Sequence, residues 1–100
     1  MSQVETSEQQ AAEAIKVTVT FPVSKKGPFE AEDPREATVG QVREAAMAYF
    51  GVSDSATGNT VITYVLTHAG LRQDNSTTLA TLAGEAHALS FRLVKVITQG

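Results

Sequence analysis

Residues 15–21 read IKVTVTF, an alternation of apolar and polar side chains that Pro22 brings to an end. A period of two residues is typical of a strand with one buried face. After a short polar connection that contains Gly27, residues 28–32 (PFEAE) alternate again, with charged side chains at every second position. The fold is therefore predicted to begin with a hairpin whose second strand is the weaker one.

A helix is predicted to begin at Thr38 and to end at Gly51. Thr38 and Gln41 have the spacing of a capping box, in which the hydroxyl accepts an early N–H and the amide side chain reaches back. Glycine is the usual residue just past a helix end. Residues at helical spacing are predicted to form one core face: Val39, Val42, Ala46, Tyr49 and Phe50. Polar or small residues expected off this face are Gln41, Arg43, Glu44 and Ala48.

The second half of the chain is predicted to supply two further strands. Residues 53–59 (SDSATGN) indicate a polar loop, and a β-branched run follows over residues 61–66. Residues 71–87 are expected to hold little regular structure beyond one helical turn, and a last strand covers residues 89–94. The side chains predicted to face the core from these strands are Ile62, Tyr64, Leu66, Leu89, Phe91 and Leu93.

The order strand, strand, helix, strand, strand predicts an α+β domain. A single apolar helix face is buried only if the strands form one sheet with the helix across it. We therefore expect a mixed sheet of four to five strands, in which the first strand pairs in parallel with the last strand at the centre.

Composition divides the chain into three parts and excludes several classes of function. Residues 1–14 are rich in Ser, Gln, Glu and Ala and are predicted to be a disordered leader; residues 15–95 form the domain, and residues 96–100 form a free, extended tail. The absence of cysteine excludes disulfides and thiolate chemistry. A net charge of −3 favours neither nucleic-acid nor membrane binding, and no apolar run is long enough to span a bilayer.

Motifs for catalysis or metal binding are absent from the sequence. His68 and His87 are the only histidines, and neither has an acidic residue at ligand spacing. The sequence also lacks G-x-S-x-G, a phosphate-binding glycine loop and paired carboxylates on a regular element. We therefore expect no metal, no cofactor, no catalytic residue and no enzyme activity.

The chain resembles the ubiquitin family over about residues 15–95. The resemblance is carried by the first strand, the helix start at Thr38, the Ala69-Gly70 turn, and the placement of Thr78-Leu79 and Leu89-Ser90-Phe91. It implies a ubiquitin-like β-grasp fold. The chain departs from ubiquitin in ending LVKVITQG rather than LRLRGG, and in having polar Thr67 and Arg92 at the positions of the apolar recognition patch. The chain more closely resembles divergent bacterial ubiquitin-like modifiers, which its leader, its acidic balance and its single terminal glycine suit.

The resemblance implies a cytoplasmic, monomeric protein modifier. In such proteins the terminal glycine carboxylate, here Gly100, is activated as an adenylate, passed on as a thioester and joined to a target amine. Its implied partners are an activating enzyme, a conjugating enzyme, a processing or deconjugating peptidase and a protein target. The tail expected to enter the activating enzyme consists of Val96, Ile97, Thr98, Gln99 and Gly100. The lysines that could accept a further modifier are Lys16, Lys25, Lys26 and Lys95.

Two alternative functions remain open at the level of sequence. A noncovalent β-grasp adaptor would dock through a sheet face or by edge pairing, with no role for Gly100. A sulfur carrier would convert the terminal carboxylate to a thiocarboxylate, although the ending Gln99-Gly100 lacks the Gly-Gly usual in such carriers. Gly100 is also compatible with a peptidase product or with an arbitrary end of the sequence.

Overall fold

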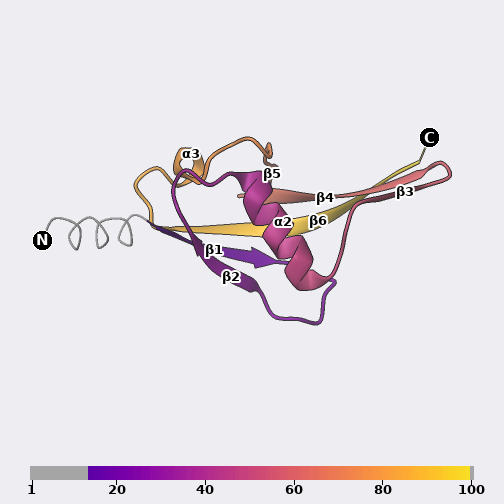
Figure 1. The fold of residues 1–100 in the computed structure, drawn as a ribbon, viewed down its shortest axis with the longest axis horizontal. Coiled ribbons are helices and arrows are strands. Elements are labelled where there is room, and N and C mark those ends of the chain that lie inside the picture. The colour runs from indigo at the N-terminus through magenta and orange to yellow at the C-terminus, as the bar shows by residue number, and fades with distance from the viewer. Residues whose placement is uncertain (1–13, 100) are drawn as a thin grey trace, which may run out of the picture.

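The computed structural model describes residues 14–99, and these form one mixed sheet with a helix across one face (Figure 1). Most of the predicted leader, residues 1–13, and the predicted conjugation site, Gly100, lie outside the described residues. The elements in chain order are β1 (Ile15–Thr20), β2 (Phe29–Asp33), α2 (Val39–Phe50), β3 (Ser55–Thr57), β4 (Thr60–His68), β5 (Leu71–Arg72), α3 (Leu79–Ala83) and β6 (Ala88–Gln99).

The sheet has the strand order β2-β1-β6-β4-β3, and β5 pairs with the end of β4. β1 and β2 form the predicted antiparallel hairpin, in which Val17 lies opposite Ala31. β1 also pairs in parallel with β6, from Lys16 opposite Ala88 to Thr20 opposite Arg92. The expected parallel pairing of the first and last strands at the centre is thus confirmed, as is the α+β β-grasp class. The sheet has six strands rather than four or five.

The core lies between α2 and the inward face of the sheet. Every second residue of β1 and of the first half of β6 is buried, as the period-two pattern predicts. The largest fully buried side chains are Ile15, Val17, Val19, Val39, Val42, Leu66, Leu79 and Leu93. Edge-to-face contacts of Phe21 with Phe50 and Tyr64, at centroid distances of 5.4 and 6.0 Å, close the end of the core.

Both predicted ends of α2 are confirmed. Thr38 Oγ1 accepts a hydrogen bond from Gln41 N at 3.2 Å, and Thr38 N donates to Gln41 Oε1 at 2.9 Å. Gly51 ends the helix in the left-handed conformation, with φ of 75°, where a Cβ would be strained.

The predicted core face of α2 is wrong at Tyr49 and Arg43, and it omits Met47. Tyr49 is 37% exposed, whereas Met47 and Arg43 are buried. Tyr49 lies at the rim of the apolar stripe, where its ring packs on Phe29 at 5.5 Å and under the Lys26 ammonium at 4.7 Å. The buried face of α2 includes Arg43 and Met47, rather than Tyr49, because β4 and the segment before β3 pack on that side of the helix.

Segments predicted to be irregular contain regular structure. Ser55–Thr57 pairs with Thr60–Ile62 of β4, so the expected loop is a short hairpin that turns at Gly58. Residues 71–87 contain β5 as well as the short helix α3. The expected free tail is also revised, because residues 96–99 belong to β6 and pair with β4. Within residues 14–99, no helix has the length and apolar character needed to cross a membrane.

Candidate functional site: the C-terminal ribbon

The end of β6 forms a ribbon with β4 that projects beyond α2 and carries the chain toward its C-terminus (Figure 1). The antiparallel register runs from Thr67 opposite Arg92 to Thr60 opposite Gln99. The β-branched residues on both strands favour this extended pairing. β3 lies along the other edge of β4. We call residues 95–99 of β6 with Thr60–Tyr64 of β4 the C-terminal ribbon.

Backbone groups of β6 alternate between its two edges. The carbonyl oxygens of His87, which immediately precedes β6, and of Phe91 accept hydrogen bonds from β1, namely from Lys16 N at 2.8 Å and from Thr20 Oγ1 at 3.4 Å. The carbonyl of Arg92 instead accepts from Thr67 Oγ1 of β4, at 3.4 Å. Since this alternation repeats every two residues, odd-numbered residues of β6 direct their backbone groups away from β4.

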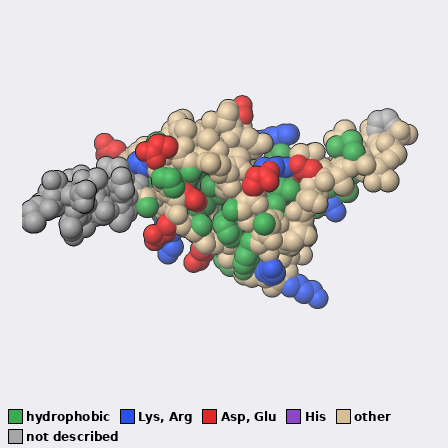
Figure 2. Space-filling model, in the orientation of Figure 1, with side chains coloured by type: hydrophobic (Ala, Val, Ile, Leu, Met, Phe, Trp, Pro, Cys, Tyr) green, Lys and Arg blue, Asp and Glu red, His purple; other side chains and the backbone are tan. Residues whose placement is uncertain are grey.

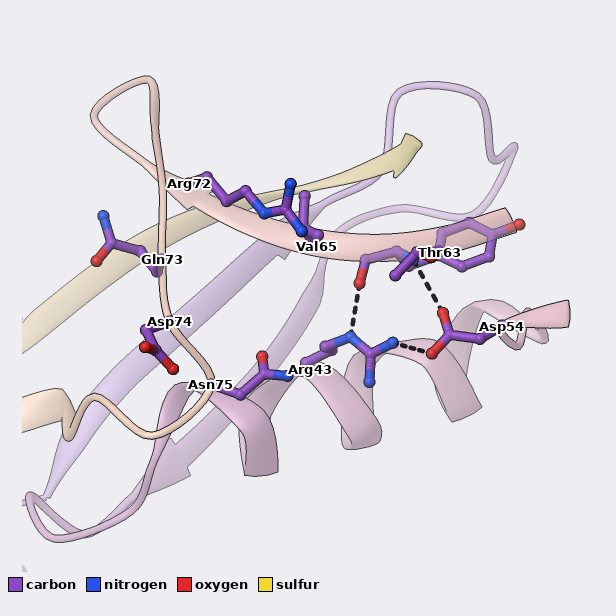
Figure 3. A pocket seen from close by; sticks show the side chains of 9 residues that line it. Arg43, Asp54, Thr63, Val65, Arg72, Gln73, Asp74 and Asn75 are labelled. Carbon is purple, nitrogen blue, oxygen red and sulfur yellow. Dashed lines mark hydrogen bonds and ion pairs between the residues drawn. The ribbon is translucent and has the colours of Figure 1, made fainter. Parts of the chain in front are cut away.

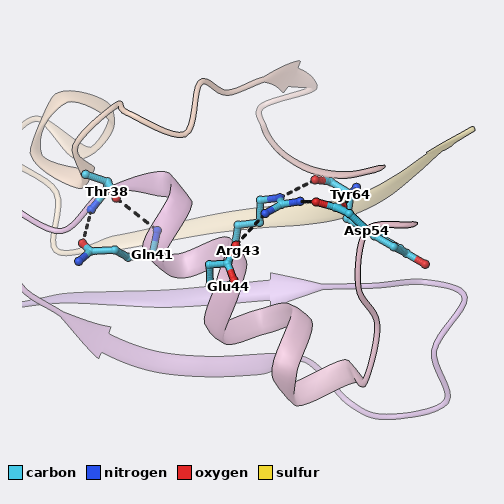
Figure 4. A network of polar contacts seen from close by, with 6 residues as sticks. All are labelled: Thr38, Gln41, Arg43, Glu44, Asp54 and Tyr64. Atoms are coloured by element: carbon cyan, nitrogen blue, oxygen red, sulfur yellow. Dashed lines mark hydrogen bonds and ion pairs between the residues drawn. The ribbon is translucent and has the colours of Figure 1, made fainter. Parts of the chain in front are cut away.

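The base of the ribbon is held to α2 by a buried arginine (Figure 4). Arg43 is only 7% exposed, and its Nε donates to the carbonyl of Tyr64 at 2.6 Å. Its guanidinium also forms an ion pair with Asp54, whose Oδ1 accepts the backbone N–H of Tyr64 at 2.9 Å. One side chain of α2 thus binds both β4 and the segment before β3.

This network lowers the pKa of Asp54. Partial burial acts to raise the pKa of Asp54, but the hydrogen bonds from Arg43 and from Tyr64 N–H, with the positive charge of Arg43, outweigh it and lower the pKa below its usual value. A hollow of about 580 Å³ adjoins the pair and is lined by Arg43, Asp54, Thr63, Tyr64, Val65, Arg72, Gln73, Asp74 and Asn75 (Figure 3). Its lining contains no histidine and no cysteine.

Sequence reasoning missed this network. Arg43 was expected off the apolar face, and Asp54 was assigned only to a loop. A signal was present, because Arg43 follows Val39 by four residues and so lies on the same helix face. The partner Asp54 could not be identified from spacing alone.

The four predicted acceptor lysines lie apart from one another on the surface. Lys16, Lys25, Lys26 and Lys95 are all exposed. Lys16 lies on β1, Lys95 lies on the ribbon, and the other two lie in the β1–β2 connection. The Lys26 ammonium donates to the carbonyl of Tyr49.

The two histidines occupy separate positions. His68 ends β4, where its Nδ1 lies 3.1 Å from the carbonyl of Ser90 and its ring lies 5.8 Å from that of Phe91. His87 immediately precedes β6. Among the described residues, no group of three His, Cys, Asp or Glu side chains could hold a metal ion.

The two polar positions singled out from the recognition patch are brought together. Thr67 and Arg92 lie directly opposite each other on the sheet face away from α2, and Thr20 continues the row on β1. A shallow hollow of about 330 Å³ lies on this face. The surface is polar here, as the sequence predicted.

Comparison with known proteins places this geometry in a class. No protein-family model and no curated protein matches the chain. Among solved structures, the ubiquitin of Caldiarchaeum subterraneum has a TM-score of 0.63 and 28% identity, with 87% of this chain and 99% of that chain covered. The ATG8 of Trypanosoma brucei has a TM-score of 0.64 and 13% identity, with 99% of this chain and 87% of that chain covered. A ubiquitin-like domain from Arabidopsis thaliana has a TM-score of 0.58 and 19% identity, with 82% of this chain and 77% of that chain covered.

The chain is a ubiquitin-like β-grasp protein. In particular, it is similar in both fold and sequence to the archaeal ubiquitin, whereas the other two likenesses concern the fold alone. The fold is consistent with the expectation that the chain is not itself an enzyme.

Proposed function

We propose that this protein is a ubiquitin-like modifier that is conjugated to target amines through the carboxylate of Gly100. The observation that carries the proposal is the course of β6, which leads the C-terminal residues away from the helix-covered body (Figure 1). A carboxylate at the end of such a strand is accessible to a partner enzyme without unfolding of the core. The likeness to an archaeal ubiquitin across nearly all of that chain supports the same proposal.

The proposed chemistry is carried out by partner enzymes on the Gly100 carboxylate. A carboxylate oxygen attacks the α-phosphorus of ATP, and pyrophosphate leaves as the acyl adenylate forms. A cysteine thiolate of the activating enzyme then attacks the acyl carbon, and AMP leaves. A conjugating enzyme takes over the thioester, and a lysine amine of the target displaces the thiolate to form an isopeptide bond. Glycine suits this position because it has no side chain to shield the carbonyl.

The tail residues Val96, Ile97, Thr98, Gln99 and Gly100 are proposed to enter the activating enzyme as an extended segment. The body, residues 15–95, supplies the surface that partner enzymes and a processing or deconjugating peptidase recognise. The exposed lysines Lys16, Lys25, Lys26 and Lys95 are available as acceptors for chain formation. A cytoplasmic location follows from the need for ATP and for these partners.

The test is a reaction of the purified chain with ATP and the activating enzyme encoded in the same genome. We expect a thioester-linked adduct that disappears on treatment with dithiothreitol, together with ATP-dependent release of pyrophosphate. A chain that lacks Gly100 is the control and should form no adduct. Absence of any Gly100-dependent adenylate or thioester would refute the proposal, whereas replacement of a terminal oxygen by sulfur in the intact mass would indicate a sulfur carrier.

A noncovalent adaptor is the second candidate, and a specific feature favours it. The edge of β6 that faces away from β4 has no partner strand beyond Arg92 within the described residues. An adaptor of this kind would keep its function when residues 98–100 are deleted, whereas a modifier would lose it.

A further inference from the structure

One edge of the C-terminal ribbon is open. β1 pairs with β6 only as far as Thr20 opposite Arg92, and β6 continues to Gln99. By the alternation established above, Lys95 and Ile97 direct their backbone N–H and C=O groups to this side. Within residues 14–99, no strand pairs with β6 there. Unpaired edge groups of this kind bind an extended segment readily.

A hollow lies at the point where this edge opens. It has a volume of about 330 Å³, and its lining is mainly apolar: Phe21, Pro22, Val23, Arg92, Leu93, Val94 and Lys95. Val23 is 76% exposed beside it, and Ile97 is 55% exposed farther along the ribbon. Hydrophobic side chains are visible on the projecting ribbon in Figure 2. Apolar side chains left open beside an unpaired edge are suited to contact with a partner.

The charges around the hollow are of one sign. Arg92 and Lys95 are the charged residues of its lining, and both are exposed. Neither forms an ion pair within residues 14–99, where the ion pairs involve Arg43. A segment that lies along this edge is therefore favoured if it carries carboxylates.

We propose that the open edge of residues 93–99, with the hollow at its start, binds an extended acidic segment of a partner protein by strand addition. The segment pairs with the backbone of Lys95 and Ile97, places an apolar side chain in the hollow and directs carboxylates toward Arg92 and Lys95. The interaction does not depend on activation of Gly100. It gives the protein a noncovalent docking surface next to its C-terminus.

The β6 strand of a second copy fits this edge less well than an acidic segment. β6 reads ALSFRLVKVITQ and contains no acidic residue. The same strand from another copy would therefore bring positive charge, and no carboxylate, to Arg92 and Lys95. This charge pattern disfavours pairing between two β6 strands.

The test uses the full chain labelled with ¹⁵N and the capped peptide Glu-Val-Asp-Val-Thr-Val-Glu-Thr. NMR titration is expected to shift signals of residues 92–99 and 21–23, and to leave those of α2 in place. Hydrogen exchange at the Lys95 and Ile97 amides should slow at least about tenfold in the complex, because those N–H groups gain acceptors. The control peptide has lysine in place of each acidic residue and should bind at least about tenfold more weakly.

Two substitutions at one position separate backbone pairing from side-chain contact. Ile97→Pro removes an N–H that points to the open edge, so it should weaken peptide binding at least about tenfold. The substitution is compatible with the β4–β6 ladder, because the Ile97 N–H points away from β4. Ile97→Thr keeps the N–H and should retain binding within about threefold of the unsubstituted chain. The signals of Val96 and Thr98 report whether the ladder remains intact in each variant.

Charge reversal provides a test that does not rely on proline. Lys95→Glu is expected to weaken binding of the acidic peptide and to strengthen binding of the lysine peptide. Absence of peptide binding, shifts confined to another surface, or equal binding of both peptides would overturn the proposal. Lys95 and Ile97 amides that are already protected in the free chain would also overturn it, because the edge would then be covered by the chain itself or by a second copy.

Discussion

Thr38 stabilises the start of α2 through two reciprocal hydrogen bonds with Gln41, whereas Thr78 precedes α3 without a side-chain cap. Thr38→Ala should therefore lower the free energy of unfolding by about 1 kcal/mol. Thr78→Ala is the matched control and should cost less than about 0.5 kcal/mol. Urea unfolding at pH 7 measures both, and equal losses in the two variants would contradict this assignment.

Asp54 links the stability of the fold to pH through its ion pair with Arg43. Its pKa is lower in the folded protein than the value of about 3.9 expected for the unfolded chain. A carboxylate whose pKa is lowered by folding stabilises the folded protein at pH values above its pKa in the unfolded chain. This stabilisation is lost as the pH falls through the pKa of the folded protein. The stabilisation by Asp54 is therefore complete at neutral pH and disappears in acid.

Asp54→Asn tests this linkage. The variant should be less stable than the unsubstituted chain at pH 7, and the difference should shrink as pH falls below about 4. The pKa of Asp74 is also lowered, through hydrogen bonds from Ser76, but that contribution is common to both proteins and cancels in the difference. Urea titrations at a series of pH values provide the measurement. A difference that stays constant down to pH 2.5 would exclude an Asp54 contribution of this kind.

At the scale of elements, the pairing of β6 with β4 bears directly on activation. Residues 96–99 are paired with β4 in the ribbon, so entry of the tail into an activating enzyme requires release from β4. A disulfide between cysteines at positions 60 and 99, which face each other in the register, should prevent this release. Because the chain has no cysteine of its own, the cross-link is unambiguous.

We expect Thr60→Cys/Gln99→Cys to be activated when reduced and to lose at least about tenfold in activation rate when oxidised. Pyrophosphate release on addition of ATP and the activating enzyme measures the rate. The single variant Gln99→Cys is the control for the substitution itself. Equal activation of both redox forms would show that the tail is used while paired, and inactivity of both the reduced form and the unsubstituted chain would count against the modifier function instead.

For the whole molecule, stability is expected to reside in the body rather than in the ribbon. The buried core ends on β6 at about Leu93, and from the ribbon's β4 strand only Tyr64, at its base, and the half-buried Ile62 pack against it. Deletion of residues 96–100 should therefore change the free energy of unfolding by less than about 1 kcal/mol. Thermal or urea unfolding checks this. A loss of several kcal/mol would show that the ribbon belongs to the cooperative unit.

The architecture of the body could be predicted from local patterns because each pattern has a direct physical cause. Alternation in residues 15–21 and 89–94 identified the two central strands, since only one face of each is covered by α2. The capping box at Thr38 and the glycine at position 51 placed both helix ends, because they satisfy or terminate the helical backbone locally. Element order then required one sheet with the helix across it.

The candidate site was less predictable because its features depend on long-range pairing. Residues 96–99 are β-branched or polar and suit either a free tail or a strand. They form a strand because β4, with nine residues, is long enough to pair with them. Burial of Arg43 likewise depends on Asp54 and Tyr64, which lie 11 and 21 residues away in the chain.

The sequence by itself determined the α+β class with one sheet and a helix across it, the limits of the helix, the inward-facing residues of the central strands and the polar character of Thr67 and Arg92. These properties follow from periodicity, capping and side-chain chemistry, all of which are local. Only the tertiary structure decided that the tail is paired, that Arg43 joins α2 to the ribbon and that one edge of β6 stays open. Those properties depend on which strands meet and where each one stops, and pairing between distant segments is not encoded in any single stretch of the chain.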